Sequence, residues 1–186
     1  MVAGCSQPAP PSGPAATPAA EGPPSVVGKG PVGALITLDP SEPSPLPEGP
    51  AVLDQYGKQF VPTTLFVRVG QPVEFRNSED ISHNVQVKRA GSGASVFNVS
   101  TDPGSKYVHT FDRAGRYDVS CDLHSGMFSA LVATTSPYFA VTDDSGAFSI
   151  ANVPAGAYTL VLSADGQDTR RPLQVGGRTE VDLTRP

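Results

Sequence analysis

Alternating apolar and polar residues run along much of the chain and predict β-strands. In residues 83–87, His-Asn-Val-Gln-Val, the first, third and fifth side chains share one face of a strand. Tyr117, Val119 and Cys121 share a face in the same way. Residues 138–150 and 153–162 also alternate, and Asp-x-Gly and Pro-x-Gly turns punctuate them. The pattern therefore predicts an all-β protein.

The N-terminal residues differ in composition from the rest of the chain. Residues 6–25 are rich in Pro, Ala, Gly and Ser, and thirteen of the twenty prolines lie in residues 1–50. Such a composition buries too little apolar surface to build a core. We predict a disordered tether over residues 1–25.

Cys5 follows Val2-Ala3-Gly4, which resembles a bacterial lipobox, where the cysteine becomes lipid-modified. The resemblance implies an exported lipoprotein, anchored to a membrane in the periplasm or at the cell surface. No charged and apolar signal segment precedes it, so we expect Met1 to be an internal start. No apolar run approaches the roughly 20 residues of a membrane-spanning helix, so attachment would be by lipid only. The alternatives are a chance run of small residues and a disulfide between Cys5 and Cys121, which would leave Cys121 without a free thiolate.

The formal net charge of −5 is unevenly distributed. Residues 1–50 carry −3, residues 51–135 are neutral with eight acidic and eight basic side chains, and residues 136–186 carry −2. Nothing in this distribution indicates a nucleic-acid partner. A neutral central region provides no strong steering field, so a partner protein would be recognised mainly through apolar residues such as Leu123 and Phe128.

Residues 121–127, Cys-Asp-Leu-His-Ser-Gly-Met, place a thiolate, an imidazole and a thioether within seven positions. Two His and one Cys with a weak axial Met are the ligand set of blue-copper centres. His83, on the inward face of its strand, is the candidate for the second imidazole. The alternative is a small core cysteine with two surface histidines. We predict one copper ion, bound by His83, Cys121, His124 and Met127.

The scarcity of these residue types supports the copper interpretation. Apart from Met1 and Cys5, the chain has one methionine and one cysteine, and it has only three histidines. The third histidine, His109, lies in Tyr-Val-His-Thr-Phe and is interpreted as an exposed strand residue that is not a ligand.

The residues around this motif resemble cupredoxins, the plastocyanin-like blue copper family. Phe111 to Ser120 is similar to the Phe…Gly-x-Tyr-x-x-x approach to the ligand cysteine, and residues 60–62, 65–80 and 83–85 are similar to the first half of the fold. Two residues between Cys and His, and two between His and Met, match the short ligand loop of amicyanin. Leu123 stands where cupredoxins often have Pro. The resemblance implies a Greek-key β-sandwich over residues 48–135, in which Asn84 ties the two ligand-bearing segments together.

The last 50 residues resemble a different domain. Their Thr-Asp-x-x-Gly-x-Phe…Pro-x-Gly-x-Tyr-x-Leu pattern is similar to the carboxypeptidase regulatory-like, prealbumin-like β-sandwich, and residues 32–38 look like the usual opening of that domain. We therefore expect residues 26–47 and 136–186 to form one smaller sandwich, with the cupredoxin inserted in it. The two pieces together exceed 60 residues, whereas 50 residues alone make a marginal domain. Sequential order, with residues 30–135 as one cupredoxin, is the alternative.

These features together predict a one-electron carrier that acts outside the cytoplasm. The chain shows no convincing hydrolytic constellation, and one spare histidine is too few for a second copper cluster, so no enzymatic activity is expected. Copper storage or delivery, through the same ligands, is one alternative. The other is an adhesion or polymer-binding lipoprotein whose smaller sandwich carries the function.

Overall fold

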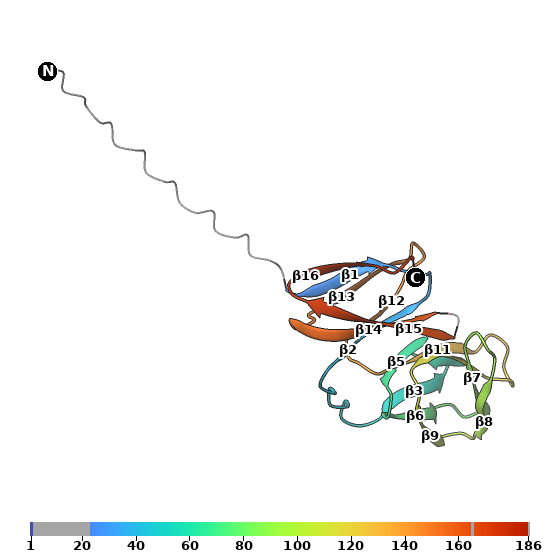
Figure 1. Ribbon diagram of the computed structural model, residues 1–186. Helices are drawn as coiled ribbons and strands as arrows, with labels where there is room; N and C mark the ends of the chain where they lie inside the picture. The colour runs from blue at the N-terminus through green and yellow to red at the C-terminus, as the bar shows by residue number, and fades with distance from the viewer. Residues whose placement is uncertain (2–22, 165, 186) are drawn as a thin grey trace.

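The chain folds into two β-sandwiches (Figure 1). The computed structural model describes residues 1, 23–164 and 166–185. Within that part of the chain there are sixteen strands and no helix, which confirms the prediction of an all-β protein. No helix in the described residues is therefore long and apolar enough to cross a membrane. The predicted tether falls almost entirely on residues 2–22, outside the described residues.

The larger sandwich packs a five-stranded sheet on a four-stranded sheet. The five-stranded sheet has the order β5 (Thr64–Arg68), β11 (Phe128–Thr134), β10 (Gly115–Ser120), β7 (His83–Arg89) and β8 (Ser95–Thr101). The four-stranded sheet has the order β4 (Gln59–Val61), β3 (Ala51–Tyr56), β6 (Pro72–Asn77) and β9 (Lys106–Thr110).

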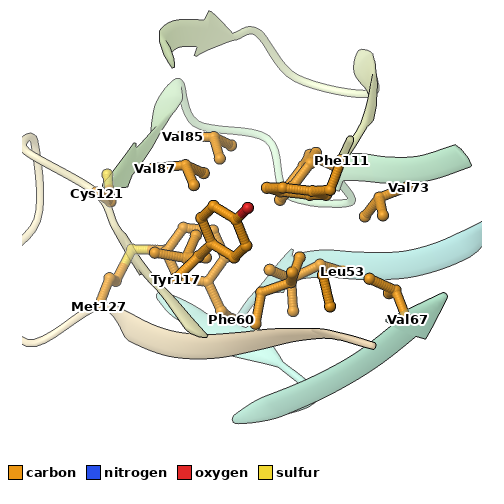
Figure 2. Packing of buried hydrophobic residues seen from close by; sticks show 14 residues of the cluster. Leu53, Phe60, Val67, Val73, Val85, Val87, Phe111, Tyr117, Cys121 and Met127 are labelled. Atoms are coloured by element: carbon orange, nitrogen blue, oxygen red, sulfur yellow. The ribbon is translucent and has the colours of Figure 1, made fainter. Parts of the chain in front are cut away.

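Inward-facing side chains of these strands form one apolar core (Figure 2). Tyr117 and Val119 of β10 lie in it, as their alternation predicts. Figure 2 shows Cys121 and Met127 at one end of this core, and Val73 at the other. The sulfur-bearing residues of the predicted site are thus part of the packing at one end of the sandwich.

His109 is placed differently from its prediction as an exposed strand residue. It lies in β9 and is half-buried, with its ring centroid 4.7 Å from that of Phe97 and 4.8 Å from that of Phe111. The prediction of exposure is wrong because His109 lies on the less exposed face of β9, where its ring packs against these aromatic rings.

The smaller sandwich has its own core and is built from both ends of the described chain. One sheet has the order β13 (Ala147–Ala151), β1 (Ser25–Lys29) and β16 (Arg178–Asp182). The other has the order β12 (Phe139–Val141), β2 (Leu35–Pro40), β14 (Gly156–Ala164) and β15 (Gln167–Val175). In the second sheet Ile36 lies opposite Leu162 and Leu38 opposite Leu160. Strands that precede and follow the larger sandwich in sequence therefore pair with one another.

The two sandwiches meet at the end of the larger one that lies away from Cys121. Arg116, at the start of β10, donates a hydrogen bond from Nη1 to the Gly33 carbonyl at 2.8 Å. The rings of Phe66 and Phe139 lie 5.0 Å apart across the same junction. Because β10 runs from this junction toward Cys121, the smaller sandwich does not cover the end of the core that holds the sulfur atoms.

Candidate metal centre

The predicted ligands come from the start of one strand and from the loop after its neighbour. His83 is the first residue of β7, and Cys121 directly follows the last residue of β10. These two strands are antiparallel neighbours, so the start of β7 and the end of β10 lie at the same end of the sheet. His124 and Met127 lie on the short loop from β10 to β11, which the Cys121 N–H closes by donating to the Met127 carbonyl at 3.2 Å. Residues 38 positions apart in sequence therefore meet at one site.

The donor atoms have the spacing of a three-coordinate metal site. Cys121 Sγ lies 3.8 Å from His83 Nδ1 and 3.8 Å from His124 Nδ1. Donor atoms about 2.0 and 2.3 Å from a shared ion, with about 120° between the bonds, lie about 3.7 Å apart. The three donor atoms are all within 4.8 Å of one another. The residues present thus fit a trigonal ion with one thiolate and two imidazole ligands.

The orientation of the His83 ring is fixed by Glu79, a residue that sequence reasoning did not single out. Glu79 Oε2 lies 2.8 Å from His83 Nε2, and the Glu79 side chain is only 12% exposed. Because a carboxylate accepts hydrogen bonds, His83 Nε2 donates to Glu79, and Nδ1 is the ring nitrogen that faces Cys121 Sγ. The only sequence signal is an acidic residue four positions before the histidine, which is too common to identify such a contact.

Glu79 is itself held by the turn between β3 and β4. The Lys58 backbone N–H donates to Glu79 Oε1 at 2.6 Å. This bond, followed by the one from His83, holds the pKa of the Glu79 carboxyl below its usual range. An ionised Glu79 therefore joins the turn to the ligand ring.

Met127 is completely buried and packs within the apolar core of the larger sandwich. Figure 2 shows its side chain on the same side of the core as Cys121. The residue therefore contributes to packing whether or not its thioether also caps a metal ion.

Asn84 connects the two ligand-bearing segments. Its Oδ1 accepts a hydrogen bond from the backbone N–H of Asp122 at 2.6 Å. Its backbone carbonyl accepts from Gln55 Nε2 at 3.1 Å, and Gln55 Oε1 accepts from the Thr101 hydroxyl at 2.6 Å. A buried polar network thus supports the strand position next to His83.

The site has one partly open side. His83 is fully buried, whereas His124 is partly exposed. The neighbouring apolar side chains Leu123 and Phe128 are 60% and 68% exposed. Among the described residues, His83, Cys121 and His124 are the one group of His, Cys and carboxylate donors close enough to hold an ion. Cys5, the predicted lipidation site, lies outside the described residues.

Comparisons with known proteins match the two sandwiches to two families. Residues 51–134 match the copper binding proteins of the plastocyanin/azurin family, and residues 125–185 match the carboxypeptidase regulatory-like domain. Ten residues, 125–134, belong to both matches. The structure places most of them in β11, which pairs with β10 and β5 of the larger sandwich.

Two plastocyanins are similar to part of the chain. The one from Ginkgo biloba is 29% identical over 86 residues, which cover 41% of this chain and 87% of that protein. The chloroplastic one from Chlamydomonas reinhardtii is 31% identical over 80 residues, which cover 39% of this chain and 55% of that protein.

Solved structures of cupredoxins are also similar. A reduced amicyanin variant has a TM-score of 0.42 and 27% identity, covering 53% of this chain and 98% of the amicyanin. A purple cupredoxin from Nitrosopumilus maritimus has a TM-score of 0.40 and 22% identity, covering 45% of this chain and 99% of that protein.

Proposed function

We propose that this chain, which combines a copper-binding domain of the plastocyanin/azurin family with a carboxypeptidase regulatory-like domain, is a one-electron carrier. The observation that carries the proposal is the position of Cys121 Sγ, 3.8 Å from the Nδ1 atoms of both His83 and His124. If copper is bound, the Cys121 thiolate would stabilise Cu(I), the imidazoles would suit both redox states, and the Met127 thioether would be a further, weaker ligand. The ligands we propose are those predicted from sequence: His83, Cys121, His124 and Met127.

Copper, when bound, supplies a Cu(II)/Cu(I) couple that gains or loses one electron. The residues of the chain hold the ligand set in place around it. The hydrogen bond that His83 Nε2 donates to Glu79 restrains rotation of the ring, and the surrounding core limits movement of Met127. A site that moves little between two redox states suits electron transfer. The proposed one-electron exchange needs no substrate at the metal, so we propose a carrier and not an enzyme.

The partly exposed His124 is the proposed edge for electron exchange. The exposed side chains of Leu123 and Phe128 flank it and offer an apolar surface to a redox protein. The smaller sandwich joins the opposite end of the copper domain, so that sandwich does not cover the proposed contact surface.

We further propose that the copper domain is inserted in the carboxypeptidase regulatory-like domain. Pairing of β2 with β14, on either side of residues 48–135, supports insertion over sequential order. Export, with lipid attachment through Cys5 to a bacterial membrane surface, completes the proposal and rests on the lipobox-like sequence alone.

The test is the visible absorption spectrum of the full chain after one equivalent of Cu(II) is added. We expect an intense blue thiolate-to-copper band that disappears on reduction. The Cys121→Ala variant should lack the band, whereas Cys5→Ala, which removes the other thiol, should keep it. A band that is missing, or that Cys121→Ala leaves unchanged, would rule out the proposed centre.

A second measurement separates electron transfer from copper storage or delivery. A carrier should cycle reversibly in voltammetry and retain its metal when a Cu(I) chelator is added. Loss of the reduced metal to the chelator within the time of one redox cycle would favour storage or delivery. An adhesion protein would bind its polymer equally well as the Cys121→Ala variant.

A further inference from the structure

Asp122, which directly follows Cys121, accepts hydrogen bonds from three side-chain amides. Its Oδ2 accepts hydrogen bonds from Asn84 Nδ2 at 2.9 Å, Asn98 Nδ2 at 3.0 Å and Gln86 Nε2 at 3.3 Å. Its backbone N–H donates to Asn84 Oδ1 at 2.6 Å. The residue after the ligand cysteine is therefore tied to the sheet by four hydrogen bonds, three of them to a carboxylate oxygen.

The three amides come from the outer face of two neighbouring strands. Asn84 and Gln86 alternate with the inward-facing His83 and Val85 along β7. Asn98 lies opposite Gln86 in the register of β7 and β8. Asn84 Nδ2 also donates to Asn98 Oδ1 at 2.7 Å, so the amides are bonded to each other as well as to Asp122. We call these four residues, Asn84, Gln86, Asn98 and Asp122, the amide clasp.

The amide clasp lies next to the proposed metal ligands. Asn84 is adjacent to His83, and Asp122 is adjacent to Cys121. The reciprocal bonds between Asn84 and Asp122 therefore join the backbone segments that carry His83 and Cys121. A charged acceptor strengthens a hydrogen bond relative to one between neutral groups. A carboxylate at this position fixes the approach of β7 to the ligand loop more firmly than an alanine or a hydroxyl side chain.

We propose that Asp122 is a positioning residue for the copper centre, which holds Cys121 Sγ opposite His83 through the amide clasp. This inference rests on the proposed function. Its distinctive consequence concerns Asn98, which is 24 positions from Asp122 and contacts no proposed ligand among its hydrogen-bond partners. Asn98 acts on the metal centre only through the amide clasp.

The test compares Asp122→Ala, Asn98→Ala and the double variant in the full chain. Loss of residues that orient metal ligands typically lowers metal affinity about 10- to 100-fold. We expect each single variant to release Cu(II) to a chelator about tenfold faster, and the double variant to be no faster than Asp122→Ala. Such non-additivity is the signature of residues that act through one network.

Asp118→Asn is the matched control. Asp118 is an exposed carboxylate of β10, about 10 Å along the strand from Cys121, and it faces Lys88 and Ala130 in the neighbouring strands. Removing its charge should leave the copper release rate unchanged. In the metal-free chain, amide hydrogen exchange of residues 122–127 should accelerate in Asp122→Ala and Asn98→Ala but not in Asp118→Asn.

The possible results separate this inference from the proposed function. The wild-type protein could show a blue band while the variants release copper at the wild-type rate and only their metal-free stability is lower. That result would overturn the inference, because the amide clasp would then stabilise the fold without positioning the ligands. Additive effects of the two substitutions would also overturn the inference. Wild-type protein without a blue band would overturn the proposed function, and the positioning role with it.

Discussion

Met127 allows packing and metal binding to be tested separately, because the structure buries its side chain in the core and we propose its thioether as a copper ligand. Its side chain is completely buried in the core of the larger sandwich. Truncation of a buried Met to Ala typically lowers the free energy of unfolding by about 2–5 kcal/mol. Replacement by Leu conserves volume and typically costs less than about 1.5 kcal/mol. Met127→Ala should therefore destabilise the metal-free protein strongly, and Met127→Leu only slightly.

The metal-bound protein should rank the same variants differently. Both substitutions remove the thioether, and the axial ligand tunes the reduction potential of such a centre. We expect Met127→Leu to retain the blue band but to shift its reduction potential, although its fold is nearly as stable as wild type. Leu131→Ala, which truncates another completely buried side chain of the same core, should lower stability without shifting the potential.

Urea unfolding of the metal-free chain, followed by circular dichroism, measures stability, and voltammetry of the copper-loaded chain measures the potential. Equal losses of stability in Met127→Leu and Met127→Ala would refute the packing argument. An unchanged potential in Met127→Leu would refute the role of the thioether as an axial ligand.

Three further predictions concern other parts of the molecule. Glu79→Gln keeps the size of the side chain but removes the carboxylate that accepts the hydrogen bond from His83 Nε2. Copper affinity, measured by chelator competition, should fall about 10- to 100-fold. Unchanged affinity would contradict a role for Glu79 in positioning the ring. Burial lowers the pKa of His109, so the unfolded chain binds a proton on this residue more readily than the folded chain does. The free energy of unfolding should therefore fall as the pH drops through about 6.5. His109→Phe should weaken this dependence in urea unfolding at pH 5 and 7.5, and a variant with the same dependence as wild type would contradict the argument. A Cβ at Gly28 would lie 2.0 Å from the Val181 carbonyl oxygen. Gly28→Ala should therefore destabilise the smaller sandwich by about 1–3 kcal/mol or more. A variant that unfolds thermally at the same temperature as wild type would disprove the close approach.

Local features of the sequence were sufficient to predict the strands and the chemistry of the site. The face of Tyr117, Val119 and Cys121 follows from the two-residue period of a strand, which does not depend on what the strand packs against. The ligand types and their spacing in residues 121–127 are likewise a property of seven consecutive residues. The expectation that residues 26–47 and 136–186 form one sandwich came from a resemblance, and the pairing of Ile36 with Leu162 agrees with it.

The tertiary structure alone decided how the site is held. Nothing local distinguishes Glu79 from neighbouring acidic residues until its loop is placed beside His83, and nothing in Asn98 indicates a bond to Asp122 until β7 and β8 pair in register. The burial of His109 depends in the same way on aromatic rings from other segments. Strand periodicity and ligand identity are short-range properties of the chain. Hydrogen-bond partners and burial depend on distances of a few ångströms between segments that only folding brings together.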